Sequence, residues 1–170
     1  MFSFTDLTPH SPQLVALVDE ALAMGRACVA SAIIIDQHDR AFVQRRAPHR
    51  LLFPSCWDIV GGHVEPGETL DEAFAREVVE ETGWSFNRLL HLIAIVDWEA
   101  EDDEQGIGRR EFCFHVEVPG DLERPRLERD KVTEFRCVGR DELDILREHR
   151  AAGDTVIYDL VRRALAHGSR

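Results

Sequence analysis

Hydrophobic residues recur at helical spacing near both ends of the chain. In the first of these two regions, Ser11 and Pro12 form a typical helix start, because serine caps the first turn and proline fits the first helical position. Apolar residues then follow every three or four positions until Gly25, which is a typical stop. Two comparable patterns occur in the last part of the chain. We therefore expect helices over about 12–24, 141–149 and 154–167.

Between these helices, runs of β-branched and aromatic residues predict strands. The run 27–35 is almost entirely apolar, which is typical of a central strand covered on both faces. A polar turn follows, and residues 41–46 are expected to return as the partner strand of this first run. Strands mixed with helices predict one α/β layered domain with a mixed sheet, spanning residues 1–170. Further strand-like runs are 57–60, 89–98, 112–118 and 132–138.

A further helix is predicted in the middle of the chain, within the stretch GGHVEPGETLDEAFAREVVEETGW at 61–84. Thr69 and Glu72 have the spacing of a capping box, and Gly83 suits the left-handed position that ends a helix. The helix should therefore run from about 70 to 82. Its apolar sector is expected to consist of Leu70, Phe74, Ala75, Val78 and Val79.

Several acids of this helix do not lie opposite the apolar sector. At helical spacing, Glu81 falls inside the sector, Glu77 at its edge and Glu80 just beyond it. Carboxylates directed towards the interior are costly unless they are paired or bound to a metal. Arg76 can pair with Glu80, but one arginine cannot neutralise three acids. Two interpretations follow: a helix face with ion pairs, or a set of ligands for a hard divalent cation.

The same stretch resembles the Nudix box, G-x5-E-x7-R-E-U-x-E-E-x-G-U, in which U is a bulky aliphatic residue. The departure from this pattern is Trp84, which stands where an aliphatic residue is usual and concerns local packing rather than chemistry. The residues before the box also look like its usual approach, so the resemblance covers at least 27–98. The matching fixed residues are Gly62, Glu68, Arg76, Glu77, Glu80, Glu81 and Gly83.

The resemblance implies a fold, a reaction and a set of site residues. The fold is an α/β/α sandwich with a mixed sheet. The reaction is hydrolysis of a phosphoanhydride in a nucleoside diphosphate linked to another group. A bound Mg²⁺ or Mn²⁺ neutralises the diphosphate and lowers the pKa of a bound water. Arg76 and Glu68 would orient the ligands of this ion. The implied ligands, one of which could also act as the base, are Glu77, Glu80, Glu81 and the carbonyl oxygen of Gly61.

The composition of the chain limits the kinds of binding partner and the cellular location that we expect. The chain of 170 residues has a formal net charge of −12, which disfavours a nucleic-acid polymer because its phosphates repel a negative protein. The longest apolar run, 89–96, is interrupted by His91 and is too short to span a bilayer. No signal-peptide pattern is visible, so a cytoplasmic location is expected. Without a CxxC pair, the expected free thiols are Cys28, Cys56, Cys113 and Cys137.

Weaker candidates for the site lie outside the box. An additional carboxylate could come from Glu99, Glu128 or Glu134, although each is also typical of a solvated surface. His63 follows the glycine pair and is expected to be exposed or to support the site rather than to bind the metal. Candidate phosphate-binding arginines are Arg45, Arg46, Arg50, Arg109 and Arg110, and candidate base-stacking aromatics are Trp57, Trp98 and Phe112.

Two other functions compete with hydrolysis. Isopentenyl diphosphate isomerases carry a cysteine directly before a Gly-His pair, whereas here Gly61 precedes Gly62 and His63, which disfavours that reaction. The remaining alternative is a catalytically silent module that binds a nucleotide or sugar phosphate as a sensor. Such modules commonly lack box glutamates that this chain retains. No subfamily marker downstream of the box assigns the substrate. The resemblance is compatible with a homodimer, but no stretch of sequence defines an interface.

Overall fold

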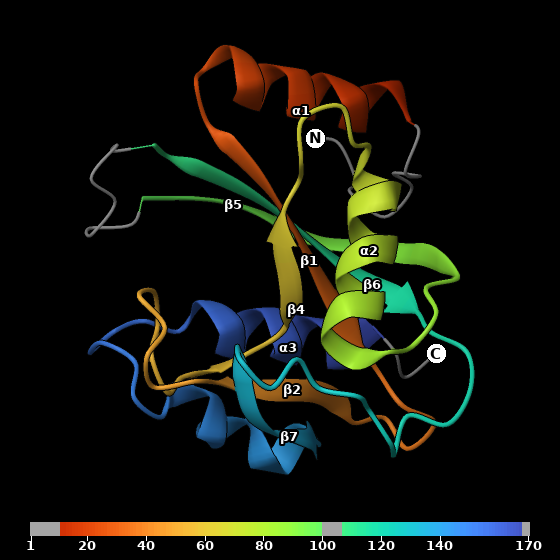
Figure 1. Ribbon diagram of the computed structural model, residues 1–170, viewed down its shortest axis with the longest axis vertical. Helices are drawn as coiled ribbons and strands as arrows, with labels where there is room; N and C mark the ends of the chain where they lie inside the picture. The colour runs from red at the N-terminus through yellow and green to blue at the C-terminus, as the bar shows by residue number, and fades with distance from the viewer. Residues whose placement is uncertain (1–10, 100–106, 168–170) are drawn as a thin grey trace.

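The computed structural model describes residues 11–99 and 107–167 (Figure 1). Within these ranges, no helix is long and apolar enough to cross a membrane. The elements in chain order are α1 (Pro12–Ala23), β1 (Ala27–Ile34), β2 (Ala41–Arg46), β3 (Trp57–Asp58), β4 (Val60–His63), α2 (Leu70–Thr82), β5 (Arg88–Trp98), β6 (Arg109–Glu117), β7 (Val132–Val138), the 3₁₀ helix η2 (Arg140–Arg147) and α3 (Val156–His167).

The described strands form a four-stranded sheet and a three-stranded sheet. The larger sheet has the order β4-β1-β6-β5, in which β1 and β6 are parallel and the two outer pairs are antiparallel. The smaller sheet has the order β3-β2-β7 and is antiparallel throughout. The prediction of a mixed sheet is therefore confirmed, and the chain adds a second sheet beside it.

The expectation that β2 would be the partner strand of β1 is wrong. Among the described residues, the connection between them is a single bridge from Ile35 to Ala41, while β2 pairs with β3 and β7. Both edges of β1 are occupied, by β4 on one side and by β6 on the other. Since a strand has only two edges, β2 cannot pair along β1, and it lies in the three-stranded sheet instead.

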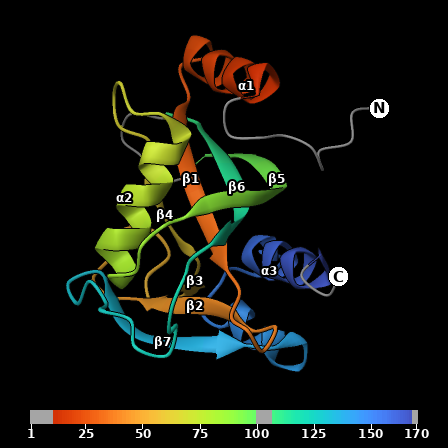
Figure 2. The same cartoon turned by 90° about the vertical axis from the view of Figure 1, so that its right-hand side faces the viewer.

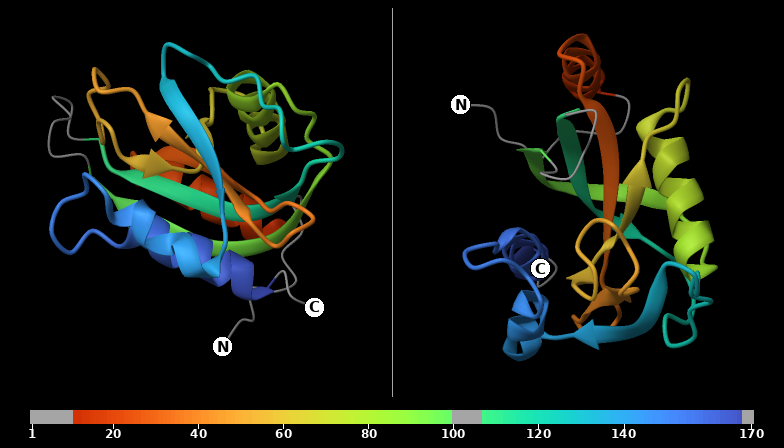
Figure 3. Two further views of the ribbon diagram at one scale, coloured as in Figure 1. Left: turned by 90° about the horizontal axis from the view of Figure 1, so that it is seen from below. Right: turned by 60° about the vertical axis from the view of Figure 1, so that its left-hand side comes forward.

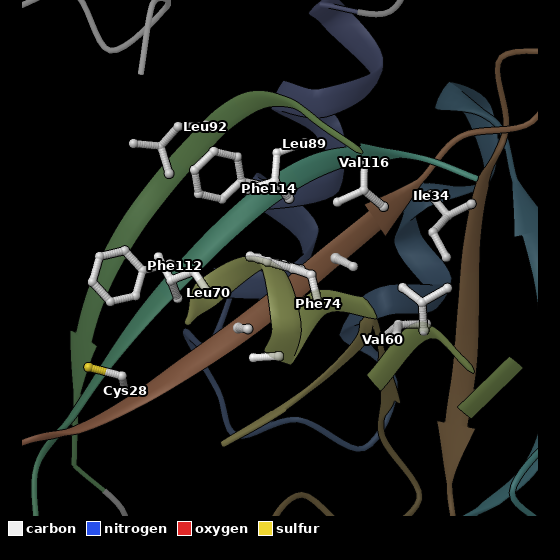
Figure 4. Close-up of a cluster of buried hydrophobic side chains, with 14 of the residues drawn as sticks. Cys28, Ile34, Val60, Leu70, Phe74, Leu89, Leu92, Phe112, Phe114 and Val116 are labelled. Atoms are coloured by element: carbon white, nitrogen blue, oxygen red, sulfur yellow. The ribbon is translucent and has the colours of Figure 1, made fainter. Parts of the chain in front are cut away.

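Helices cover both faces of the four-stranded sheet, which gives an α/β/α sandwich. In Figure 2, α2 and α3 lie on opposite sides of this sheet. Successive residues of β1 point to opposite sides, so Ile34 packs in the core with Phe74 of α2, whereas Ile33 packs in the core with Leu160 of α3. Figure 4 shows the first core, in which Phe74 lies among Cys28, Leu89, Phe112 and Phe114.

The two C-terminal helical segments differ in type. The segment expected over 141–149 is the 3₁₀ helix η2, whose buried residues Leu143 and Leu146 are three positions apart, as three residues per turn require. The chain has left this helix by His149, which has a φ of 61°. Asp154 accepts a hydrogen bond from the N–H of Val156 at 3.2 Å, where α3 begins. Figure 3 shows both segments beside the three-stranded sheet.

Candidate functional site

The helix α2 carries the acids of the site and has the expected bounds. The capping box of Thr69 and Glu72 closes its N-terminus, and Gly83 has a φ of 72° at its C-terminus. The expected apolar sector is wrong at two positions, because Val79 is 45% exposed and Ala75 is only partly buried, while Ala73 and the acid Glu77 are buried instead. The face towards the sheet follows positions three and four apart, namely Leu70, Ala73, Phe74, Glu77, Val78 and Glu81.

Glu81 points from the last turn of α2 towards the sheet and is 7% exposed. Its Oε2 accepts hydrogen bonds from the N–H of Gly61 at 3.1 Å and from the side-chain amide of Gln44 at 2.6 Å. Burial raises the pKa of Glu81 to about 8, and the neighbouring carboxylates of Glu77 and Asp58 add to this, while the two hydrogen bonds oppose it. The donors are neutral, so they leave the negative charge of an ionised Glu81 uncompensated.

Glu77 packs against the glycine pair of β4. A Cβ atom on Gly62 would collide with the carboxylate of Glu77, so this close approach requires glycine. The guanidinium of Arg76 donates a hydrogen bond to Oε1 of Glu77. Burial raises the pKa of Glu77, and the hydrogen bond from Arg76 opposes this rise. The backbone of Gly61 and Gly62 thus lies against both buried glutamates.

Arg76 connects the loop before α2 to the glutamates. Its Nε and Nη2 donate to the two carboxylate oxygens of Glu68 at 2.9 and 3.0 Å, and Nη2 also donates to the carbonyl of His63 at 2.9 Å. Its Nη1 reaches Glu77 and, at 3.4 Å, Glu80. The hydrogen bonds from Arg76 lower the pKa of Glu68. One guanidinium therefore holds a loop carbonyl and three carboxylates together.

The box glutamates are not arranged as a closed set of metal ligands. The side chain of Glu80 is 48% exposed. In the part of the chain that the structure describes, no three His, Cys, Asp or Glu side chains are placed to hold a metal ion. Glu77 and Glu81 face Arg76 and Gln44 instead. A cation would bind these carboxylates by replacing their present partners, so the ligand set stays a prediction.

Two features of the site nevertheless fit a divalent cation. The buried carboxylates of Glu77 and Glu81 lie side by side, and the hydrogen bonds to Glu81 come from neutral groups. In addition, Oε1 of Gln44 is buried and has no hydrogen-bond partner among the described residues, which costs free energy. Hard cations such as Mg²⁺ and Mn²⁺ prefer oxygen ligands. Because oxygen atoms dominate this set, its chemistry suits such an ion.

A cavity of about 360 Å³ lies beside Glu81 and the glycine pair. This volume is sufficient for a small-molecule ligand. Its lining comes from both sheets, including Ser31 of β1, Gln44 of β2 and Glu111 of β6. Because residues of both sheets line the cavity, it forms only where the chain passes from β1 in one sheet to β2 in the other. Of the two buried box glutamates, Glu81 lines the cavity, so a ligand there would meet its carboxylate.

Several weaker candidates have other partners. Among the acids outside the box, Glu99 lines the cavity, whereas Glu128 pairs with Lys131 at 3.0 Å and Glu134 pairs with Arg45 at 2.9 Å. Residues 100–104 of the acidic run after β5 lie outside the described residues. These ion pairs are compatible with a structural role for Glu128 and Glu134.

Some of the candidate arginines and aromatic residues line the cavity, and others do not. Arg46, His63 and Trp98 line it. Arg109 lies over the ring of Trp98 at 5.0 Å, and Arg110 pairs with Asp97 at 2.8 Å. Trp57 and Phe112 are 1% and 0% exposed and belong to the hydrophobic cores. The candidates that do not line the cavity are Arg45, Arg50, Arg109, Arg110, Trp57 and Phe112.

Part of the cavity lining was not predicted from the sequence, namely the polar residues Gln44, Asp58 and Glu111. A signal was present for Glu111, because it is an acid in a strand whose neighbouring positions alternate between two buried faces. Gln44 is likewise a polar residue in a short apolar strand and is 3% exposed. Local spacing could identify such residues but could not show that they meet.

Comparison with known proteins identifies relatives of part of the chain. The family model of the NUDIX domain matches residues 25–160. A Nudix hydrolase from Deinococcus radiodurans is 42% identical over 80 residues, which cover 45% of this chain and 47% of that protein. The nucleoside triphosphatase NudI from Escherichia coli strain K12 is 43% identical over 85 residues, covering 47% of this chain and 57% of that protein. The chain thus spans about half the length of the curated relatives it matches.

Solved structures share the fold. A MutT protein from Methanosarcina mazei Go1 has a TM-score of 0.65 at 22% identity, covering 85% of this chain and 96% of that one. A NUDIX hydrolase from Nitrosomonas europaea has a TM-score of 0.65 at 23% identity, covering 84% and 90%. At these identities the likeness concerns the fold alone. The expected α/β/α sandwich is confirmed.

Proposed function

Because this chain belongs to the NUDIX domain family, we propose that it hydrolyses a phosphoanhydride bond in a nucleoside diphosphate linked to another group. One observation carries this proposal more than any other. Two buried glutamates, Glu77 and Glu81, lie against the Gly61–Gly62 backbone beside a cavity of ligand size. Buried carboxylates without enough positive charge are costly for the fold, so their presence favours a catalytic role.

The residues proposed to hold Mg²⁺ or Mn²⁺ are Glu77, Glu80, Glu81 and the carbonyl of Gly61. When bound, the ion supplies positive charge to the diphosphate oxygens and lowers the pKa of a water molecule. The protein holds the ligands of this ion in place. Arg76 and Glu68 hold the helix and its preceding loop in register, so that Glu77 stays against Gly62.

We assign the proton acceptor to Glu81. Burial raises the pKa of this carboxyl to about 8 in the metal-free protein, and a bound cation would lower it, so the assignment rests on the position of Glu81. Its location at the wall of the cavity gives it access to a water molecule next to a bound diphosphate. Glu77, which is ion-paired with Arg76, is less suited to accept a proton.

The proposal also covers the kind of substrate, the cellular location and the oligomeric state. The substrate is a small molecule, and Arg46 and Lys131 of the cavity lining are positioned to attract its phosphates. Residues 1–170 form a single domain that works in the cytoplasm, where its four free thiols stay reduced. A homodimer is compatible with this function. The alternative function is a catalytically silent sensor that binds a nucleotide or a sugar phosphate, and retention of every box glutamate argues against it.

The proposed function is tested by measuring phosphate release over a panel of nucleotide derivatives, with Mg²⁺, with Mn²⁺ and with a chelator. The panel contains nucleoside triphosphates, nucleotide sugars, dinucleoside polyphosphates, ADP-ribose and NADH, with a coupled phosphatase to reveal the products. We expect metal-dependent turnover of at least one class. Binding of a nucleotide without turnover of any class would instead support the sensor.

Replacing Arg76 by lysine should lower kcat by about 10- to 100-fold, a typical loss for residues that orient metal ligands. Lysine keeps the positive charge but cannot donate at once to Glu68, Glu77 and the carbonyl of His63. Steady-state kinetics on the best substrate measures the loss. The control is Arg88→Lys, at an exposed arginine that pairs with Glu117. An Arg76→Lys protein as active as the wild type would remove Arg76 from the catalytic account.

A further inference from the structure

Glu111 is an acid in the cavity that the proposed chemistry does not use. It lies on β6, where Phe112 and Phe114 point into the core under α2 and Glu111 points to the opposite side of the sheet. Its Oε1 accepts a hydrogen bond from the hydroxyl of Ser31 at 2.6 Å, and its Oε2 accepts one from the indole N–H of Trp98 at 2.9 Å. The carboxylate is therefore held in one orientation from both sides.

The groups that contact Glu111 give it no counter-charge. The hydroxyl and the indole are neutral, as is the thiol of Cys113, which lies 3.7 Å from Oε1. Burial raises the pKa of Glu111, and the nearby carboxylate of Asp58 raises it further, while the hydrogen bond from Ser31 opposes the rise. A purely structural role is poorly served by such an acid, because an amide or an apolar side chain would fill the position at lower cost.

The carboxylate of Glu111 has hydrogen-bonding capacity left. An ionised carboxylate has about four acceptor positions, of which Ser31 and Trp98 use one on each oxygen. Oε2 thus keeps one acceptor position. The second position of Oε1 is used by the thiol of Cys113 at 3.7 Å, a weak donor that an N–H group of a ligand would replace, and Glu111 lines the cavity. Two parallel acceptors side by side match a ligand edge with two adjacent N–H donors. Among nucleobases, guanine presents such an edge through N1–H and the 2-amino group.

The charge distribution also indicates which end of a nucleotide approaches Glu111. A phosphate would be repelled by Glu111, whose hydrogen-bond donors are neutral, whereas the charge of Asp58 is balanced by Arg46 at 3.4 Å. The phosphates are instead expected at the Gly61 and Glu81 end, where the metal is proposed to bind. The apolar rings of Phe53 and Trp98, 5.9 Å apart, line the same cavity and suit a base better than a phosphate.

We propose that Glu111 is a specificity-determining residue that binds the N1–H and 2-amino donors of a guanine base. This assignment rests on the proposed function, in that it takes the ligand to be a nucleotide. Ser31 and Trp98 act as positioning residues, because they fix the plane of the carboxylate. Loss of one of the two donors leaves a buried acceptor unpaired, which disfavours bases that lack the 2-amino group.

Calorimetric binding of GMP and IMP tests the assignment without any hydrolysis, because a monophosphate contains no phosphoanhydride. The two ligands differ only in the 2-amino group. The wild-type protein with Mg²⁺ should bind GMP about tenfold or more tightly than IMP, the usual scale for a paired base contact. In Glu111→Gln the ratio of the two affinities should fall close to one, because a neutral amide no longer favours the second N–H donor. Glu117→Gln, on the same strand but outside the cavity lining, should keep the wild-type ratio.

The thermal midpoint of unfolding of Glu111→Gln, compared with that of the wild type, shows whether the variant is folded. XMP provides a test that needs no variant, because a carbonyl replaces its 2-amino group and faces the carboxylate, so XMP should bind more weakly than GMP and IMP. Equal affinity of the wild type for GMP and IMP, or a preference that survives in Glu111→Gln, overturns the assignment. Turnover of other bases with no preference for guanine would leave the proposed hydrolysis standing and reject the role of Glu111. Guanine-selective binding without turnover would support the role of Glu111 and reject the proposed hydrolysis.

Discussion

Glu81→Gln is expected to lower kcat by about 100- to 10,000-fold, the range for loss of a general base, while leaving the fold intact. Glutamine has the same shape and can still accept hydrogen bonds from Gly61 and Gln44 through its carbonyl oxygen. It cannot take a proton and is a weaker ligand for a divalent cation. Because Glu81 lies in the cavity wall, both losses act at the reacting phosphate.

The measurement is steady-state turnover of the best substrate of the panel, together with the thermal midpoint of unfolding. Glu117→Gln makes the same chemical change on an edge of the molecule that does not line the cavity, and it should retain wild-type turnover. A Glu81→Gln protein that is folded and hydrolyses its substrate at the wild-type rate would show that Glu81 is no part of the mechanism.

The metal-free protein is expected to lose stability as the pH rises from 6.5 to 8. The pKa of Glu81 is about 8 in the folded protein, above its ordinary value of 4.5, so the folded state holds a proton that the unfolded state has released between these values. Stability is therefore highest below about pH 4.5 for this group and declines as the pH rises towards 8. Over the 1.5 units up to pH 8, the decline is about 2 kcal/mol.

Between pH 6.5 and 8, the effect of Glu81 on stability can be measured apart from that of His115, whose effect on stability has the opposite dependence on pH. Burial lowers the pKa of His115 to about 4, below its ordinary value of 6.5, so its contribution to stability rises with pH and is complete near pH 6.5. Urea unfolding with a chelator at pH 6.5 and at pH 8 measures the decline. Glu81→Gln should show a smaller decline, because it has no proton to lose. A decline of the same size in the variant would assign it to other groups.

Local patterns predicted the part of the site that lies in one continuous segment. The capping box, the glycine after α2 and the bounds of that helix are as expected, because these signals act between residues only a few positions apart. The exposure of Val79 and the burial of Glu77 were not predicted. Which stripe of a helix faces a sheet depends on how the helix packs, and in α2 the glycine pair of β4 makes room for an acid.

The rest of the site depends on contacts between distant residues. Ser31 and Glu111 are 80 positions apart and meet because β1 and β6 are parallel neighbours, which a pattern along the chain does not reveal. Gln44 and Glu81 are 37 positions apart and meet because β2 of the three-stranded sheet lies near the last turn of α2, whereas the sequence suggested a single sheet. The misplaced pairing of β2 therefore concealed the cavity, since residues from both sheets line it.

Binding of Mn²⁺, followed by electron paramagnetic resonance, is the most direct test of whether the buried box glutamates hold the catalytic cation. Because the signal of free Mn²⁺ disappears on binding, the titration needs no substrate. The wild type should bind Mn²⁺, Glu77→Gln and Glu81→Gln should bind it at least about tenfold more weakly, and Glu117→Gln should match the wild type. Equal binding by the wild type and the two site variants, or no binding by the wild type, would contradict the account.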